Sequence, residues 1–208
     1  MTEPAGDSAW PALLLVMALP VESQGIFERA AVPVLYTGLG KVNAAIALMR
    51  RLTEYRAAGA ALPRVVNFGS AGSRHFRTGE LVSCRRFVQR DMDVSALGFA
   101  LGQTPFENIP AELQFPPMFA HLPEGLCGSA DGFETGASPL HCEVIDMEAY
   151  ALAKVCYVEG AAFACAKFIT DGADHAAASD WERNLQHAAN AFWRLYQELP
   201  LRLQSPPA

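Results

Sequence analysis

The sequence predicts an α/β fold in which helices flank a mainly parallel, twisted central sheet, giving three layers. The first observation is that residues 12–19 and 161–170 are almost continuously apolar and of strand length, which is typical of strands buried on both faces. The second is that patterns of helical period, at residues 42–52 and 147–158, lie between the strand patterns. Chains that alternate in this way form parallel strands with helices on both faces.

Composition favours one intracellular domain that binds a small molecule. The chain has 208 residues, of which 51% are hydrophobic, enough for a full core. We expect a loose tail at residues 1–10 and a single domain over residues 11–203. The formal charge of −6 argues against a nucleic-acid surface, so the expected partner is a small molecule.

The cysteines and histidines predict neither a metal site nor a cofactor. Five cysteines are spread through apolar runs, as expected of reduced thiols in a cytoplasmic protein, and the five histidines share no metal-ligand spacing. The apolar run 12–19 is too short to cross a membrane. We therefore expect a cytoplasmic protein with no metal, no cofactor and no membrane contact.

The first half of the chain contains two glycine turns. Residues 38–41 follow a short strand at 32–37, but they lack the phosphate-loop pattern, so we expect close packing there. Residues 69–72 follow a strand at 64–68 and read as a turn that admits a ligand. The helix after the first turn has an expected buried face of Val42, Ala45, Ile46, Met49 and Leu52.

The middle of the chain is predicted to be irregular. A strand at 80–84 leads into residues 85–102, which we expect to form a loop that reaches a neighbouring subunit. Five prolines in residues 103–125 forbid a regular helix. The aromatic residues in this segment must be buried against something: a ligand, a partner subunit or neighbouring strands of the same chain. Packing against the chain's own strands is the default expectation.

Three acidic residues carry the functional prediction. Glu22 follows the first strand, Asp171 ends the strand at 161–170, and Glu148 opens the helix at 147–158, where the helix dipole favours an anion. Ligands of open α/β sheets bind beyond the carboxyl ends of the strands, so these acids should face one crevice. Paired carboxylates without a metal or a nucleophile suggest acid–base hydrolysis.

Six motifs, in order, carry a resemblance to a known family. They are Ala18-Leu-Pro-Val-Glu22, Gly38-Leu-Gly-Lys-Val42, Asn67-Phe-Gly-Ser-Ala-Gly72, Asp131-Gly-Phe133, Asp146-Met-Glu-Ala149 and Thr170-Asp-Gly-Ala-Asp174. Over residues 12–200 the chain resembles the purine nucleoside phosphorylase and nucleosidase family, and within it most the 5′-methylthioadenosine/S-adenosylhomocysteine nucleosidases. The resemblance implies a compact variant of that fold, a purine nucleoside substrate and a homodimer.

The resemblance also implies roles for the acids. Glu22 falls where the base activates the attacking water, and Asp171 where an acid protonates N7 of adenine. Glu148, with Met147, falls where the ribose hydroxyls are held. An anion there would stabilise the oxocarbenium-like sugar left when adenine departs.

Further residues are implied to form the pocket around the substrate. Phe133 would stack on the purine, Lys167 would lie on the ribose side, and Trp181 would be an aromatic near the nucleoside. Val94 and Leu97 match a stretch that a second subunit contributes to the pocket for the 5′-substituent. The remaining lining residues implied are Leu19, Leu39, Ser70, Ala71 and Gly72.

Two positions favour water over phosphate as the acceptor. The phosphorylases of this family hold phosphate with arginines in the first loop and just before the Gly-Ser element, where this chain has Glu22 and Asn67. A carboxylate would repel phosphate, and the guanidinium clamp is missing. Three alternatives stay open: a phosphorylase, a nucleosidase for another 5′-substituted nucleoside (futalosine or adenosyl-lipid type), and a nucleoside-binding protein without activity.

Overall fold

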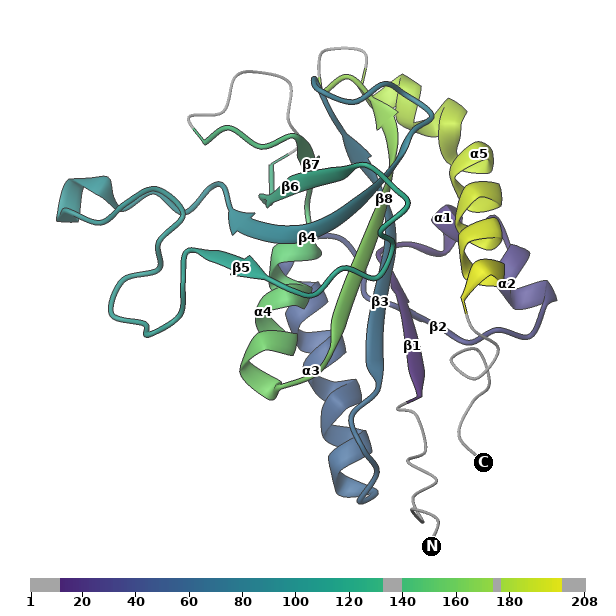
Figure 1. Cartoon of the computed structure of the whole chain (residues 1–208), viewed down its shortest axis with the longest axis horizontal. Coiled ribbons are helices and arrows are strands. Elements are labelled where there is room, and N and C mark those ends of the chain that lie inside the picture. Colours follow the sequence, from purple (N-terminus) through teal and green to yellow (C-terminus); the bar gives the residue numbers. More distant parts are fainter. Residues whose placement is uncertain (1–11, 133–139, 174–176, 200–208) are drawn as a thin grey trace, which may run out of the picture.

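The computed structural model describes residues 12–132, 140–173 and 177–199 (Figure 1). The predicted tail at 1–10 and the predicted stacking residue Phe133 lie outside these residues. The elements are β1 (Leu13–Met17), α1 (Pro20–Ser23), α2 (Ile26–Arg29), β2 (Val34–Tyr36), α3 (Lys41–Ala57), β3 (Arg64–Gly72), β4 (Leu81–Gln89), the 3₁₀ helix η1 (Ser95–Leu97), β5 (Glu112–Gln114), β6 (Glu124–Ser129), β7 (Val144–Asp146), α4 (Ala149–Glu159), β8 (Phe163–Asp171) and α5 (Ala177–Glu198).

The predicted α/β class is confirmed, but the sheet is mixed and closes on itself. Parallel pairings join β1 to β2 and β3, β3 to β8, and β6 to β4 and β7. Antiparallel pairings join β4 to β8, β3 to β7 and β4 to β5. The path β3–β8–β4–β6–β7 returns to β3, which makes a barrel-like ring. The expected open, mainly parallel sheet is corrected because β3 connects to β4 without a helix, so β4 runs back along β8.

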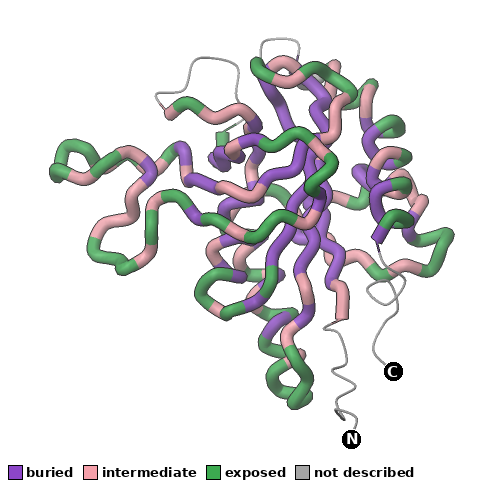
Figure 2. Tube along the Cα trace, in the orientation of Figure 1, coloured by how far each residue is buried: buried purple, intermediate pink, exposed green. Residues whose placement is uncertain are grey.

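Helices cover both sides of this sheet. α5 packs on β8 and β3 with α1 and α2 beside it, whereas α3 and α4 pack together on the opposite side (Figure 1). Each side has its own apolar cluster, one containing Leu48, Leu52 and Leu152 and the other Phe68 and Phe192. The strands at the centre are almost entirely buried (Figure 2). The barrel therefore gives the strand ends a rigid base.

The predicted turn at residues 69–72 is wrong, because these residues continue β3 to Gly72. The glycines are required by their neighbours rather than by a turn. A Cβ on Gly69 would lie 2.9 Å from Nζ of Lys167, and a Cβ on Gly72 would lie 2.7 Å from Oδ1 of Asp171. Two charged side chains therefore approach the β3 backbone directly.

The predicted buried face of α3 is only partly right. Leu52 is buried and Ala45 and Met49 are partly buried, but Val42 and Ile46 are 66% and 53% exposed. The fully buried positions are Ala44, Leu48 and Leu52. The helix carries apolar residues on more than one stripe, and its contact with α4 selects which stripe is covered.

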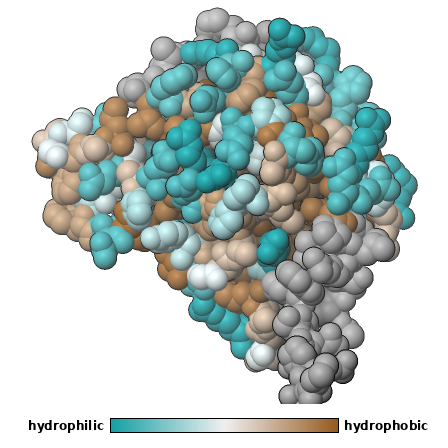
Figure 3. All heavy atoms as spheres, viewed as in Figure 1, coloured by the Kyte–Doolittle hydropathy of each residue, from teal (hydrophilic) through white to brown (hydrophobic). Residues whose placement is uncertain are grey.

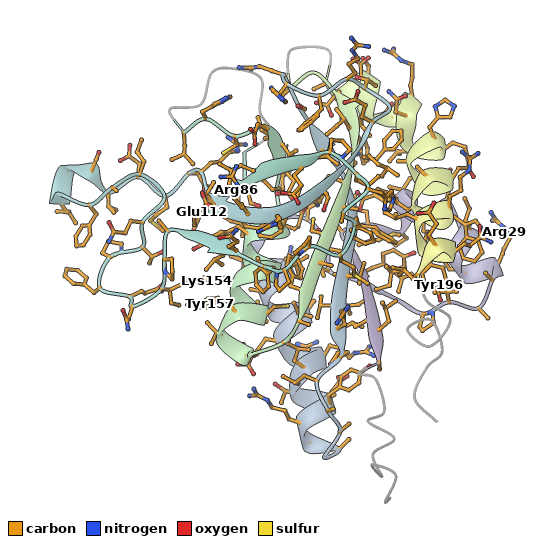
Figure 4. The ribbon with its side chains drawn as sticks, viewed as in Figure 1. Arg29, Arg86, Glu112, Lys154, Tyr157 and Tyr196 are labelled. Atoms are coloured by element: carbon orange, nitrogen blue, oxygen red, sulfur yellow. The ribbon has the colours of Figure 1, made fainter. Side chains whose placement is uncertain are left out.

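The proline-rich segment is covered mainly by the protein's own strands. Before β6 begins at Glu124, it contains the short strand β5, whose Glu112 lies beside Arg86 of β4 (Figure 4). Phe115 lies 5.3 Å from Phe163 between ring centroids, and Phe119 lies 6.1 Å from Phe68. Packing against neighbouring strands, the default expectation, is therefore the cover for these two rings.

Residues 91–111, called the arm below, project from the body (Figure 1). Its side chains are largely exposed, with Leu97 at 70% and Phe106 at 94% (Figure 2). Lys154 of α4 forms a 2.5 Å ion pair with Glu107 and so ties the arm to the body. Among the described residues, no helix is both long and apolar enough to span a membrane. One domain over residues 11–203 stays a prediction.

Candidate active site

A cavity of about 210 Å³ opens at the ends of β1, β3 and β8, and the start of α5 closes one side. The residues that line it come from eight separate stretches of the chain. They are Ala18, Leu19, Glu22, Leu39, Ser70, Ala71, Gly72, Arg90, Gly132, Ile145, Asp146, Met147, Glu148, Thr170, Asp171, Ala173 and Trp181. The three acids that the sequence singled out therefore face one cavity, as expected.

Glu22 is held by hydrogen bonds on both carboxylate oxygens. It lies in α1, just after β1, because Pro20 ends the strand and can begin a helix. Oε2 accepts from the backbone N–H of Ala18 and of Leu19, each at 3.0 Å. Oε1 accepts from the backbone N–H of Ser70 at 2.9 Å and from its hydroxyl at 2.8 Å. Four donors around a side chain that is 4% exposed fix a carboxylate at the cavity wall.

Ser70 joins Glu22 to the start of α5. Its Oγ accepts a hydrogen bond of 2.9 Å from the indole Nε1 of Trp181. Ser70 belongs to β3 and Trp181 to the first turns of α5, so the contact crosses from the sheet to a helix. A chain of hydrogen bonds thus runs from the helix to the carboxylate.

Glu148 lies between β7 and α4, immediately before the first residue of the helix. Its Oε1 accepts a hydrogen bond of 2.8 Å from the backbone N–H of Gly40, which has a φ of +87° that favours glycine. Burial, and then the negative charge of Asp146, raise the pKa of Glu148 to about 8. The carboxyl group can therefore change its charge near neutral pH.

Asp171 ends β8 and is 5% exposed. Its Oδ2 accepts from the hydroxyl of Thr170 at 2.8 Å, and its Oδ1 accepts from the backbone N–H of Ala173 at 2.9 Å. The side chain is thus fixed in the cavity wall by its own neighbours in sequence. Each oxygen keeps a further lone pair for a ligand.

A buried ion pair lies beside these acids. Nζ of Lys167 is 2.8 Å from Oδ2 of Asp146, and both side chains are almost fully buried. Burial opposes both charges, yet the attraction of Lys167 lowers the pKa of Asp146, and the charge of Asp146 raises that of Lys167. Asp146 also accepts from the hydroxyl of Ser129 and the backbone N–H of Ala149. These bonds fix the strand end that carries Glu148.

Most of the predicted site residues come together. Glu22, Asp171, Glu148, Met147, Ser70, Ala71, Gly72, Leu19, Leu39 and Trp181 all line the cavity. Lys167 does not; it lies behind the wall, paired with Asp146. Val94 and Leu97 lie on the arm and do not line the cavity of this chain.

Sequence reasoning missed several lining residues, above all Asp146 and Arg90. Asp146 stands two residues before Glu148, and Lys167 interrupts an otherwise apolar strand; a lysine inside such a strand signals a buried counter-charge. Arg90 directly follows β4, and its Nη2 donates to the carbonyl of Gly132 at 3.2 Å. No signal in the sequence marked Ile145.

Comparison with known proteins identifies the relatives of the chain. The family model described as Phosphorylase superfamily matches residues 23–199. Two relatives are named 5′-methylthioadenosine/S-adenosylhomocysteine nucleosidase. That of Marinomonas sp. is 29% identical over 84% of this chain and 83% of its own, and that of Actinobacillus succinogenes is 30% identical over 80% and 79%.

Solved structures share the fold. S-adenosylhomocysteine nucleosidase of Streptococcus pyogenes superposes with a TM-score of 0.75 at 21% identity, covering 94% of this chain and 100% of the other. Futalosine hydrolase of Helicobacter pylori superposes with a TM-score of 0.75 at 22% identity, covering 91% and 98%. The resemblance seen in the motifs is thus confirmed.

Proposed function

The chain belongs to the phosphorylase superfamily, and from this premise we propose that it hydrolyses the N-glycosidic bond of a 5′-modified adenosine and releases adenine. The substrate class is that named for its relatives, methylthioadenosine or S-adenosylhomocysteine. The observation that carries the proposal is that Glu22, fixed by four donors, faces the same cavity as Asp171.

Glu22 is the general base. A water molecule next to Glu22 gives it a proton, which takes the place of one of the four hydrogen bonds that the carboxylate accepts, while the water oxygen forms a bond to C1′ of the ribose. Because the four donors orient Glu22, its geometry does not need to change before the reaction. Ser70, which donates to Glu22, lies where it can also contact this water.

Asp171 is the general acid. It donates a proton to N7 of adenine as the C1′–N9 bond breaks and the bonding electrons leave with the base. Protonation makes adenine a better leaving group, and the 6-amino group can donate to the other carboxylate oxygen. The bonds from Thr170 and Ala173 hold the side chain in place for this transfer.

Glu148 binds the ribose. Its carboxylate accepts hydrogen bonds from the 2′- and 3′-hydroxyls, and Met147 packs beside the sugar. When the base departs, positive charge develops on the ribose ring, and Glu148 stabilises it in its ionised form, whose share grows as the pH approaches its pKa of about 8. In the same proposal Phe133 stacks on adenine; this residue lies outside the described residues.

Water is the acceptor rather than phosphate. A phosphate beside Glu22 would meet a carboxylate instead of a guanidinium group. Asn67, at the position where the phosphorylases have an arginine, is 2% exposed and donates to the backbone carbonyl of Val16. Two cations near the cavity already have partners in the protein, since Arg90 donates to the carbonyl of Gly132 and Lys167 is paired with Asp146. These contacts also favour water as the acceptor.

The protein is proposed to act as a cytoplasmic homodimer. The arm presents Leu97 and Phe106 to solvent, and apolar side chains gather on it (Figure 3). In the dimer, Val94 and Leu97 of the partner subunit complete the pocket for the 5′-substituent. Sedimentation of the purified protein is expected to give the mass of two chains, and a monomer that is fully active contradicts this part.

A panel of 5′-substituted adenosines tests the substrate class. We expect free adenine from methylthioadenosine or S-adenosylhomocysteine in phosphate-free buffer. Futalosine is a second candidate substrate, since a futalosine hydrolase shares the fold. Cleavage of futalosine and of no other analogue would show that the protein is a futalosine hydrolase. Tight binding of every analogue without cleavage would show that it is a nucleoside-binding protein without activity.

A further inference from the structure

The contact between Trp181 and Ser70 has a consequence for the base. A serine hydroxyl has one proton and two lone pairs, whereas an indole N–H can only donate. Because Trp181 occupies a lone pair of Ser70 Oγ at 2.9 Å, the serine proton must point elsewhere, and Oε1 of Glu22 is 2.8 Å away. The direction of both hydrogen bonds is therefore set by the indole.

Of the four donors to Glu22, three are backbone N–H groups, two between β1 and α1 and one in β3. The hydroxyl of Ser70 is the fourth, and it can rotate about its C–O bond. Without the indole, that hydroxyl has other orientations in which it does not donate to Glu22. Ser70 is thus the adjustable member of the set, and Trp181 removes its freedom.

α5 holds Trp181 in place from the other side of the site. Three residues later, Asn184 donates from Nδ2 to the backbone carbonyl of Thr170 at 3.0 Å. Residues three apart lie on the same face of a helix. Leu185 and Phe192 anchor the rest of α5 in the core. One face of α5 therefore touches the strand that ends in Asp171 and, through Ser70, the residue Glu22.

We propose that Trp181 is a positioning residue for the hydrolytic reaction, which it serves by orienting the Ser70 hydroxyl toward Glu22. This inference rests on the proposed function of the site. The Ser70 hydroxyl accepts from the indole with one lone pair and donates its own proton to Glu22. Its second lone pair accepts a hydrogen bond from the attacking water. Trp181 thus fixes the water against the base without touching it.

A double-mutant cycle tests the inference. Trp181→Phe keeps an aromatic ring and removes the N–H, so kcat should fall about fivefold, as for loss of one neutral hydrogen bond, while KM stays within about twofold. In the Ser70→Ala background the same substitution should have no further effect. Trp193→Phe, on the same helix but packed on Phe27 and Tyr196, is the matched control and should leave kcat unchanged.

Two results would overturn the inference: an unchanged kcat in Trp181→Phe, or an equal loss of kcat with and without Ser70. A second readout needs no activity. Hydrogen exchange of the Trp181 indole N–H should be slow in the wild type and faster in Ser70→Ala, with Trp193 unaffected. Unchanged exchange contradicts the inference even if no nucleoside is cleaved, whereas absent cleavage with the expected exchange contradicts only the proposed function.

Discussion

Replacing Glu22 by glutamine tests the assignment of the base. The carboxylate accepts from two donors on each oxygen, Ala18 and Leu19 on one side and the Ser70 backbone and hydroxyl on the other. An amide has one oxygen and one NH₂ group. With the NH₂ group toward Ser70, the Ser70 hydroxyl can rotate and accept from it, but the Ser70 backbone N–H loses its acceptor. A buried unsatisfied donor costs about 1–3 kcal/mol, so Glu22→Gln should lower the unfolding free energy by about 1–3 kcal/mol.

The same substitution should lower adenine release much further than stability alone explains. Loss of a general base costs at least about a hundredfold in kcat. Urea unfolding measures the first effect, and adenine released under saturating nucleoside measures the second. Glu28→Gln is the control, because Glu28 lies nearby, bonds to Ser23 and Tyr36, and does not line the cavity. If folded Glu22→Gln releases adenine at a rate within about threefold of the wild type, Glu22 is not the base.

Two further predictions concern the other acids. Asp171→Asn keeps an acceptor for the backbone N–H of Ala173, so the unfolding free energy should change by less than about 1 kcal/mol, whereas adenine release should fall at least about a hundredfold. The rate of cleavage of a nitrophenyl riboside, whose leaving group needs no proton, should fall far less. Equal losses of rate on both substrates argue against an acid role. The pKa of Glu148 is about 8 in the folded chain and 4.5 ordinarily, so folding favours the neutral carboxyl group. The unfolding free energy therefore falls as the pH rises from about 4.5 through about 8. Glu148→Gln should therefore gain stability over the wild type between pH 5 and pH 9, by at most about 5 kcal/mol at about 1.4 kcal/mol per pH unit, and a difference that stays constant with pH in urea unfolding counts against the raised pKa.

The acids could be placed from the sequence because each is tied to a local signal. Pro20 ends a strand before Glu22, and the apolar run of β8 ends at Asp171. Strand ends of this kind meet at one edge of a sheet, whatever the path of the strands between them. This is why most of the predicted site residues line one cavity even though the sheet was predicted as open and parallel.

The remaining features depend on contacts between distant parts of the chain. The closure of the barrel needs β4 to turn back along β8, and strand direction leaves no mark in the sequence of either strand. The strand over residues 69–72 read as a turn because glycine is permissive in turns, whereas here the glycines make room for Lys167 and Asp171. These positions are decided by packing rather than by local preference.

The buried pair of Asp146 and Lys167 illustrates the same limit. Each residue is unusual in its own strand, but the sequence does not show that the two side chains meet; they do so only in the folded chain. Their bond holds the end of β7 and thereby the position of Glu148. A site residue that acts through another one is thus harder to predict than one that faces the ligand.

The most direct test of the account is the rate of adenine release from methylthioadenosine with and without inorganic phosphate. Hydrolysis with Glu22 as the base predicts the same rate in both and free methylthioribose as the second product. Release that requires phosphate and yields a sugar 1-phosphate would contradict the account and show that the chain is a phosphorylase.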